Sequence, residues 1–484
     1  VDLAALRTAR GWGRVVCKPA VANGGDGMWV SADDPAADQA HLDALLAEAD
    51  VAVDAVLGTG SRGAPRGTAG EAVEALRRAA AAGTTVVACD LPSGVDADDG
   101  SVAGPAVRAD LTVTFGALKR GLVLHPGASH AGRVLLGSLG TAYDTFAAAH
   151  ASWAALTPAG AAPEPFGPAV DKRARGLVLA VAGAVGTSGA AALAGGGALA
   201  AGAGLVTVAT PTPARAEVAA RSDAGVMVRG LPVTPEDDLD PDAVHALPPL
   251  PEPPGAVVAG PGLGTGPGVH ALVAALRRRA ARLVLDADAL NVHREHPGAL
   301  AEHRGVLVLT PHERELARIG GGGDGPDAWA QRVVRVPELA AALDATIVAK
   351  GPGTLIAAPD GRVWVTPVGG PALGSGGTGD VLAGVLGAAI AGATDVPLAV
   401  ARAVWWHAAA GALAGATRAG RATATDLLAT LPQVLARLAV TERPVTTQRP
   451  ATHRARRGPG AVRTAACWGA LPWEAWLAPG EERG

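Results

Sequence analysis

The sequence predicts an α/β protein with two domains, each built on a largely parallel sheet. Short apolar strands alternate with Ala- and Leu-rich helical stretches along most of the chain, and this alternation is typical of parallel sheets covered by helices. The clearest strands end in polar, glycine-rich loops. At 484 residues the chain is longer than one ordinary core accommodates, so we expect more than one domain.

Composition and charge exclude several classes of function. The formal net charge is -4 and 49% of the residues are apolar, so neither nucleic acid nor an anionic membrane is an expected partner. Cys17, Cys89 and Cys467 lie far apart and form neither a zinc motif nor a disulfide framework, which favours the reducing cytoplasm. Residues 176–214 lack charge, but their Gly and Ala content favours a buried strand–helix–strand unit over a membrane span.

The first 140 residues contain five apolar runs that we predict to be strands, at 14–17, 51–56, 85–89, 111–115 and 133–136. The second run contains Asp54 and leads into the glycine-rich loop 58–63, and the third leads into Asp90-Leu91-Pro92-Ser93-Gly94. Ligands of open α/β sheets bind outside the carboxyl ends of the strands. We therefore expect Asp54, the 58–63 loop, Asp90 and Ser93 to share one cleft.

An earlier glycine-rich turn, Asn23-Gly24-Gly25-Asp26-Gly27, adds an amide and a carboxylate to this set. Asn, Asp and Ser oxygens that converge without Cys or His suit a hard monovalent or divalent cation. Taken alone, each of these residues is more often a turn residue than a ligand. The sequence thus leaves both a cation site and a set of tight turns open.

These motifs, together with Thr114-Phe115-Gly116-Ala117-Leu118-Lys119, resemble those of the NAD(P)HX epimerase domain. The resemblance implies a Rossmann-like three-layer domain over residues 1–140. It implies that NADHX or NADPHX is bound by Asn23, Gly24, Gly25, Asp26, Gly58, Thr59, Gly60, Ser61, Arg62, Gly63, Ala64 and Asp90, and that K⁺ is bound by Asn23, Asp54 and Ser93. The stretch between Asp26 and Asp54 is too short for the helix, strand and helix usual there, so we expect either a truncated domain or a gap in the sequence.

The second domain is predicted over residues 171–440, after an Ala- and Pro-rich linker at 141–170. Six stretches begin with an apolar strand, and most continue into a polar loop: 177–183, 205–208, 257–264, 283–291, 306–313 and 346–354. In a parallel sheet these loops lie at one edge. We expect the functional site of this domain at that edge.

The most informative stretch is Gly374-Ser375-Gly376-Gly377-Thr378-Gly379-Asp380, directly before an apolar helical run. Glycines allow successive N–H groups to face one point, and the helix that follows adds the positive end of its dipole. The stretch therefore predicts an anion-binding loop, and it is not a Walker motif because no Lys-Ser or Lys-Thr follows it. Asp380 is either a general base beside a bound phosphate or a helix cap.

The order and spacing of these motifs resemble those of the ADP/ATP-dependent NAD(P)HX dehydratases, from about residue 175 to residue 438. The resemblance implies a ribokinase-like α/β domain that dehydrates the S form of NAD(P)HX with ADP or ATP and Mg²⁺, in a homo-oligomer. It implies a catalytic base at Asp380, nucleotide binding by Lys350, Gly351, Pro352, Gly353, Thr354 and Gly379, and hydrate binding by Ala203, Gly262, His312 and Asp380.

Two other interpretations remain open at the level of sequence. The second domain is alternatively a kinase for a small hydroxymethyl compound such as a vitamin precursor, and the N-terminal domain alternatively only binds a nucleotide or a partner chain. Trp405-Trp406-His407 is expected to pack in the core or at an oligomer interface. Residues 441–484 are rich in Arg, Pro and Thr and are predicted to be disordered or foreign to the fold.

Overall fold

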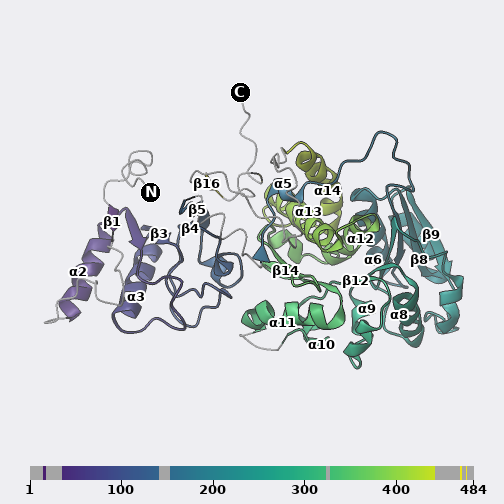
Figure 1. Ribbon diagram of the computed structural model, residues 1–484, viewed down its shortest axis with the longest axis horizontal. Helices are drawn as coiled ribbons and strands as arrows, with labels where there is room; N and C mark the ends of the chain where they lie inside the picture. Colours follow the sequence, from purple (N-terminus) through teal and green to yellow (C-terminus); the bar gives the residue numbers. More distant parts are fainter. Residues whose placement is uncertain are drawn as a thin grey trace, which may run out of the picture. The chain divides into compact units, whose positions relative to one another are not determined.

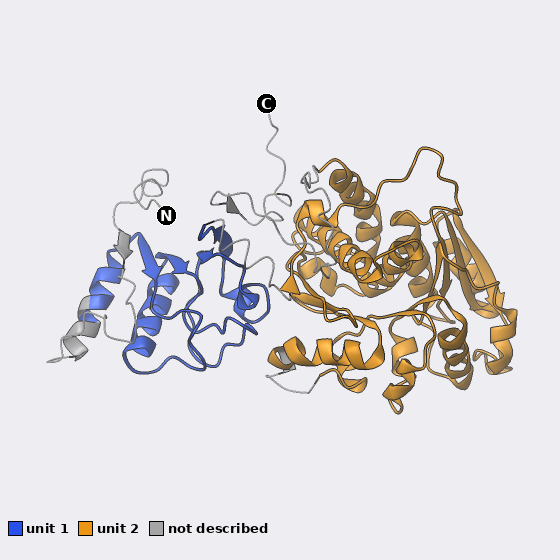
Figure 2. Ribbon diagram, viewed as in Figure 1, with its two compact units in different colours: residues 1–151, 463–475 blue, residues 152–462, 476–484 orange. Residues whose placement is uncertain are grey.

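The computed structural model describes residues 15–17, 35–140, 153–322, 328–441, 469–470 and 476. The chain divides into two compact units, shown in Figure 2: unit 1 contains residues 1–151 and 463–475, and unit 2 contains residues 152–462 and 476–484. Each unit has its own sheet with flanking helices (Figure 1). The predicted α/β class is confirmed for both.

The sheet of unit 1 is parallel from β1 to β5. Its strands are β1 (Val15–Cys17), β2 (Val51–Asp54), β3 (Thr85–Cys89), β4 (Leu111–Phe115) and β5 (Arg133–Gly137), with β16 (Gly469–Ala470) antiparallel to β5. Among the described strands the order follows the chain, β1-β2-β3-β4-β5-β16. Every one of the five predicted strands is present, and their carboxyl ends lie at one edge because they are parallel.

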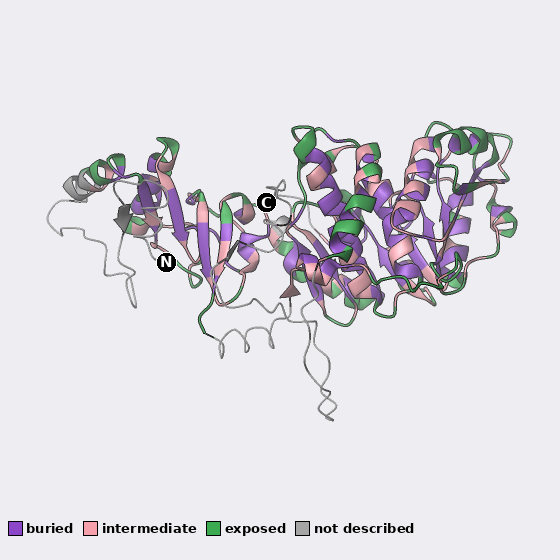
Figure 3. Ribbon diagram, turned by 90° about the horizontal axis from the view of Figure 1, so that it is seen from above, coloured by how far each residue is buried: buried purple, intermediate pink, exposed green. Residues whose placement is uncertain are grey.

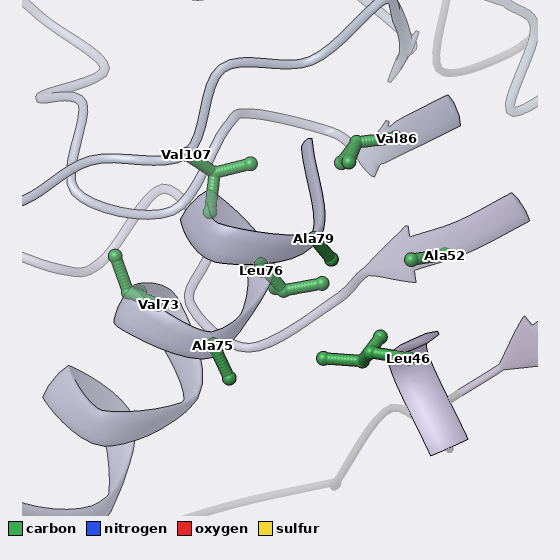
Figure 4. Close-up of a cluster of buried hydrophobic side chains, with 8 residues drawn as sticks. All are labelled: Leu46, Ala52, Val73, Ala75, Leu76, Ala79, Val86 and Val107. Carbon is green, nitrogen blue, oxygen red and sulfur yellow. The ribbon is translucent and has the colours of Figure 1, made fainter. Parts of the chain in front are cut away.

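Helices α2 (Pro35–Ala47) and α3 (Gly67–Ala81) pack beside this sheet, and the short 3₁₀ helices η1 (Arg120–Leu122) and η2 (Gly127–Ser129) precede β5. Figure 4 shows the core that joins α2 and α3 to β2 and β3, in which Leu46, Leu76 and Val86 meet. Fully burying one such side chain stabilises the fold by about 1.5–3 kcal/mol. This packing fixes the strands whose ends carry Asp54 and Asp90.

Unit 2 contains a ten-stranded mixed sheet within the described residues, in the order β6-β15-β14-β13-β12-β11-β10-β7-β8-β9. Its strands are β6 (Trp153–Ala154), β7 (Leu177–Val181), β8 (Leu205–Pro211), β9 (Val226–Leu231), β10 (Gly255–Ala259), β11 (Arg282–Leu285), β12 (Val306–Leu309), β13 (Thr346–Ala349), β14 (Thr354–Ala357) and β15 (Val363–Thr366). The strands from β13 to β9 are parallel, and β14 runs antiparallel to both of its neighbours. The strands are largely buried (Figure 3).

The helical segments of unit 2 connect these strands. They are α5 (Pro158–Ala161), α6 (Ser188–Ala200), η3 (Thr212–Ala214), α7 (Arg215–Arg221), η4 (Pro241–Ala246), α8 (Pro267–Arg279), α9 (Asp288–Asn291), η5 (Pro297–Ala301), α10 (Glu313–Arg318), α11 (Ala328–Leu343), η6 (Pro371–Gly374), α12 (Thr378–Ala391), α13 (Val396–Thr417) and α14 (Ala424–Ala439). Small residues bring α12 and α6 close together, because a Cβ at Gly384 would overlap the carbonyl oxygen of Ala194. This contact explains the uncharged, Gly-rich composition around α6. Within the described residues, every helix falls short of what crossing a bilayer requires.

The order in which the chain adds strands to the sheet reverses between β7 and β10, although the strands themselves stay parallel. The chain proceeds from β7 to β8 and β9 on one side, and continues from β10 through β11 and β12 to β13 on the other. Such a reversal opens a crevice at the carboxyl ends of the two central strands, which is where open α/β sheets bind their ligands. The loops after β7 and β10, at 182–187 and 260–266, border this point.

Two stretches differ in detail from what the sequence predicts. The predicted linker 141–170 contributes β6, which pairs with β15, and α5, whose Ala161 carbonyl accepts a hydrogen bond from Trp406 Nε1 at 2.6 Å. In the predicted tail, β16 pairs with β5, and Trp476 packs edge-on against Trp405 with ring centroids 5.2 Å apart. The prediction of disorder for 442–468, 471–475 and 477–484 lies outside the described residues.

Candidate active site

The loops at the carboxyl edge of the unit 2 sheet are tied to one another. The backbone N–H of Gly183 donates to the carbonyl of Pro261 at 2.7 Å, and the hydroxyl of Thr187 donates to the carbonyl of Gly262 at 2.7 Å. Gly262 has a φ of 63°, which glycine adopts without strain. The loops that follow β7 and β10 therefore form one braced wall of the crevice.

The hydroxyl of Thr378 shapes the glycine-rich loop before α12. Thr378 Oγ1 lies 2.8 Å from the carbonyl oxygen of Leu373 and 2.9 Å from that of Ser375. Gly377 is the N-cap of α12 with a φ of 87°, so a residue with a Cβ would be strained there. The loop thus presents backbone N–H groups at the positive end of the α12 dipole, which is the arrangement that binds anions.

Asp380 lies in the first turn of α12 and is partly buried. Burial raises the pKa of its carboxyl group to about 6; the carboxylates of Asp286 and Asp288 add to the rise, and the ammonium of Lys350 opposes it. Its carboxylate forms no hydrogen bond with any residue that the structure describes, and the N-cap position belongs to Gly377. A carboxylate that does not cap its helix and titrates near neutrality has the properties of a general base.

Lys350 follows β13 and its ammonium group faces three acidic side chains. Lys350 Nζ lies 2.7 Å from Asp286 Oδ1 and 4.0 Å from Glu315 Oε2. Asp286 is only 1% exposed and also accepts a hydrogen bond from Thr310 Oγ1 at 2.6 Å. Burial alone would lower the pKa of Lys350, but Asp286 and Glu315 outweigh burial and raise it. The ammonium group therefore stays charged beside Asp380.

Backbone strain occurs where Asp286 and Asp288 emerge from β11. Ala287 lies between them with a φ of 48°, which is unusual for a residue with a Cβ and costs about 1–3 kcal/mol. Asp288 Oδ2 accepts a hydrogen bond from Gly264 N at 2.8 Å, which joins this turn to the loop after β10. The hydrogen bonds of Asp286 with Thr310 and Lys350, and of Asp288 with Gly264, compensate this strain and hold both carboxylates at the crevice.

His312 begins helix α10 as part of a capping box. Its Nδ1 accepts from Arg314 N at 3.1 Å and from Glu315 N at 3.4 Å, and Glu315 Oε2 accepts from His312 N at 2.9 Å. In the neutral ring the proton is then on Nε2, which lies 3.3 Å from Glu315 Oε1. The ring is 50% exposed. His312 thus both shapes α10 and presents an exposed ring face.

A second group of polar residues lies at the carboxyl edge of the unit 1 sheet. Asp54 and Ser93 are buried. Ser93 donates to Asp54 from its hydroxyl at 2.6 Å and from its backbone N–H at 2.7 Å, and Ser93 Oγ accepts from Leu57 N at 2.9 Å. The ends of β2 and β3 are therefore joined through two oxygen-bearing side chains, and oxygen atoms are the donors that hard cations prefer.

Asp90 lies beside this pair with a φ of 74°. Its Oδ1 is 2.5 Å from Lys119 Nζ and accepts from Thr114 Oγ1 at 3.1 Å. The neighbouring thiol of Cys89 has a raised pKa because of burial and the nearby carboxylates of Asp90 and Asp54. A strained aspartate paired with a lysine is a candidate acid–base pair.

The glycine-rich loop after β2 is anchored by Arg62, which pairs with Asp96 at 2.6 Å and with Asp98. A small pocket separates this loop from the segment after Ser93. It is lined by Ser61, Gly63, Gly94, Val95, Asp96, Ser101 and Ala103. Ser61 and Gly63 belong to the predicted 58–63 loop, whereas Asp54, Asp90 and Ser93 do not line this pocket.

Comparison with known proteins identifies both units. The profile of the NAD(P)H-hydrate dehydratase family matches residues 178–433, which is more than half of the chain, and the profile described as YjeF-related protein N-terminus matches residues 26–121. The bifunctional NAD(P)H-hydrate repair enzyme Nnr of Moorella thermoacetica is 38% identical over 408 residues, or 83% of this chain and 76% of that relative. The chain belongs to the bifunctional NAD(P)H-hydrate repair enzymes.

Other members of this repair family and one solved structure are also similar. The Nnr enzyme of Pyrobaculum aerophilum is 37% identical over 398 residues, covering 81% of this chain and 75% of its own length. The crystal structure of the ADP/ATP-dependent NAD(P)H-hydrate dehydratase from Bacillus subtilis, co-crystallized with ATP/Mg²⁺, is 29% identical with a TM-score of 0.48. It covers 58% of this chain and 96% of that one.

The structure of this repair enzyme brings most of the predicted dehydratase residues to one edge. Lys350 and Asp380 share the acidic crevice, while Gly351 and Gly353 form the hairpin turn that leads into β14, with φ values of 153° and 68°. Ala203 does not join them. It is buried in the turn between α6 and β8, at the amino ends of the strands, so it lies at the opposite edge of the sheet from Gly262.

For the epimerase part of the family pattern, Asp54 and Ser93 are in direct contact. Asp90 follows β3 and the 58–64 loop follows β2, which are neighbouring parallel strands. The other predicted residues lie outside the described part of the chain: Asn23, Gly24, Gly25 and Asp26.

Four residues of the dehydratase crevice were not singled out from sequence: Asp286, Asp288, Thr310 and Glu315. Asp286 has the same local signature as Asp90, an aspartate directly after a buried strand, and this signature is the one that could have indicated it.

Proposed function

We propose that unit 2 dehydrates the S form of NADHX and NADPHX with phosphoryl transfer from ADP or ATP, and that unit 1 interconverts the R and S forms. The observation that carries the first part is the pairing of Asp380 with the anion-binding loop: a base whose pKa is about 6 lies in the first turn of the helix that the loop precedes. Family membership supports the substrate class. A cytoplasmic location and a homo-oligomeric state belong to the same proposal.

The proposed reaction begins with deprotonation of the ring hydroxyl of the hydrate by Asp380. The hydroxyl oxygen attacks the terminal phosphorus of the nucleotide, and the bond to the leaving AMP or ADP breaks. The phosphate then leaves the ring with that oxygen while the adjacent carbon loses a proton, which yields the reduced nicotinamide. The charge on the moving phosphoryl group is stabilised by the N–H groups of residues 376–379 and by Lys350.

The hairpin Gly351-Pro352-Gly353-Thr354 is proposed to hold the nucleotide beside the phosphoryl site. Thr354 Oγ1 donates to the carbonyl of Gly351 at 2.9 Å, so the turn is already ordered by its own contacts. Gly262 and His312 are proposed to contact the hydrate. Within the described residues, no group of three His, Cys, Asp or Glu side chains is suited to hold a metal ion, so Mg²⁺ is proposed to arrive with the nucleotide phosphates.

For unit 1, Asp54 and Ser93 are proposed to hold K⁺ with Asn23. The ion would supply a fixed positive charge next to the substrate, while Asp90 and Lys119 hold or move a proton at the hydroxyl-bearing carbon. The pocket beside Ser61 and Gly63 is proposed to receive part of the dinucleotide.

The proposal is tested by incubating the full chain with the S form of NADHX or NADPHX and either nucleotide. We expect recovery of the reduced-nicotinamide absorbance with one nucleotide or both. No recovery with either would refute the dehydratase proposal, and consumption of the nucleotide with a small hydroxymethyl compound instead would support the kinase interpretation.

The unit 1 proposal predicts that the R form is consumed by the full chain at a rate well above its spontaneous conversion, and faster in K⁺ than in Na⁺. Ser93→Ala removes one proposed ligand and the hydrogen bond to Asp54, and we expect it to abolish the K⁺ dependence without altering turnover of the S form. Equal rates of R-form consumption in wild type and Ser93→Ala would contradict this role of Ser93.

A further inference from the structure

The buried histidine of α13 is aimed at the anion-binding loop. His407 is 7% exposed, and its Nε2 lies 2.8 Å from the carbonyl oxygen of Thr378, the first residue of α12. Burial lowers the pKa of the imidazole to about 4, so the ring is neutral at neutral pH. A carbonyl oxygen only accepts, so Nε2 carries the ring proton and donates it to Thr378.

We propose that His407 is a positioning residue that orients the Thr378–Gly379 peptide, and through it the phosphoryl-binding N–H of Gly379. The peptide group is planar. A hydrogen bond that fixes the carbonyl of Thr378 therefore also fixes the direction of the N–H of Gly379, which points the opposite way, toward the open end of the helix. The inference rests on the proposed function, because it assigns His407 to the same site.

The contacts around the loop single out His407 among its neighbours. Thr378 Oγ1 bonds to the carbonyls of Leu373 and Ser375, which lie within five positions of it in the chain, so it shapes the loop only locally. His407 instead links the loop to α13. The same helix supports the loop at Gly411, where a Cβ would lie 2.5 Å from Leu373 Cδ2. Helix α13 is therefore one of the helices against which the loop packs, together with α6 and α14, whose Leu193 and Ala424 lie close to Gly377.

The tryptophan before His407 provides a matched control. Trp406 is equally buried at 7% and also donates a single hydrogen bond to a carbonyl, at Ala161, but that carbonyl is not part of the loop. Trp406→Phe and His407→Leu each remove one buried donor from the same turn of α13. A purely structural role for His407 predicts similar effects of the two substitutions.

The experiment measures the affinity for ADP by calorimetry, and kcat and KM with the S-form hydrate, for wild type, His407→Leu, His407→Gln and Trp406→Phe. We expect His407→Leu to weaken ADP binding about fivefold and to lower kcat about 10- to 100-fold, with little change in KM for the hydrate, since a misplaced donor mainly affects the transition state. His407→Gln extends an amide donor to the place of Nε2, and should retain both values within about threefold of wild type.

Two results would overturn this role: equal losses in His407→Leu and Trp406→Phe, or wild-type kcat and ADP affinity in His407→Leu. If His407→Leu does not fold, His407→Gln is compared with His407→Asn, because the asparagine side chain reaches only the place of Nδ1 and cannot replace the Nε2 donor. Equal activity and equal ADP affinity of these two variants would also overturn the positioning role of His407. A wild-type protein that binds ADP but leaves the hydrate unchanged would refute the proposed reaction, and the ADP affinities would still decide the role of His407.

Discussion

Replacing Asp380 by asparagine is expected to lower kcat by about 10²–10⁴-fold while leaving the affinity for ADP or ATP unchanged. The two side chains have nearly the same shape, but the amide cannot accept the proton of the ring hydroxyl, and general bases contribute about this factor. The nucleotide is unaffected because its proposed contacts are the loop N–H groups, Lys350 and the 351–354 hairpin. Steady-state kinetics with the S-form hydrate, and calorimetry with ADP, measure the two quantities.

A second aspartate in the first turn of a helix provides the control. Asp426 accepts hydrogen bonds from Thr423 N and Oγ1, both at 2.8 Å, in the capping box of α14. Asp426→Asn therefore weakens a cap and should lower the melting temperature slightly with kcat intact. Asp380→Asn should not destabilise the fold, because burial already disfavours the charged carboxylate. Retained kcat in Asp380→Asn would show that Asp380 is not the base.

The strands and their ends are the part of the fold that sequence predicts best. An apolar run and the polar residues that follow it are neighbours in the chain, so β3 has the predicted bounds and β2, β12 and β13 begin at the predicted residues. The antiparallel strands β14 and β15 were not. They follow a Gly-Pro-Gly turn that was interpreted only as a nucleotide loop, although the same turn closes a hairpin.

The crevice of unit 2 was predicted only in part, because its charges meet across the fold. Asp286 and Lys350 are 64 positions apart in the chain, and their ion pair depends on the order of β11, β12 and β13 in the sheet. A local pattern shows that Asp286 ends a strand, but not which cation it faces. The position of Ala203 shows the same limit: a local pattern indicates the Gly-rich segment around it, but not the edge of the sheet at which it lies.

His407 shows a different limit of sequence interpretation. In an Ala-rich helix beside two tryptophans it is expected to pack in the core or at an oligomer interface, and in the structure it is buried. The sequence does not indicate that the loop before α12 approaches this face of α13. A histidine that only fills space in a core and one that orients a loop have the same residue type. They differ in the acceptor that Nε2 contacts, which here is the carbonyl of Thr378.

Replacing Lys350 by methionine is expected to affect both stability and pH dependence. The substitution leaves Asp286 and Glu315 buried without their cation, and breaking a buried ion pair costs about 3–5 kcal/mol. It also removes the charge that lowers the pKa values of Asp380 and Glu315. The acid limb of kcat/KM, expected near pH 6 in wild type because Asp380 must be ionised, should then move up by about one pH unit.

The direction in which the stability of Lys350→Met changes with pH follows from the carboxyl groups of Asp380 and Glu315. In Lys350→Met their pKa values in the folded state rise further above the values in the unfolded state, so protonation favours the folded protein. The loss of stability is therefore greatest at neutral pH and shrinks as the pH falls through those raised values. Thermal unfolding across pH 5–8 measures this trend, with the exposed Lys172→Met as the control for loss of a lysine.

Lys350→Arg separates the charge of Lys350 from its shape. An arginine keeps a positive charge beside Asp380, so the acid limb should stay near its wild-type position even if kcat falls because the larger guanidinium displaces the nucleotide. An unshifted limb in Lys350→Met would mean that Lys350 does not tune Asp380. If the acid limb shifts in Lys350→Met but not in Lys350→Arg, the positive charge at position 350 keeps Asp380 ionised at the working pH. One buried cation would then serve both the deprotonation of the hydroxyl by Asp380 and the stabilisation of the phosphoryl group at the anion-binding loop.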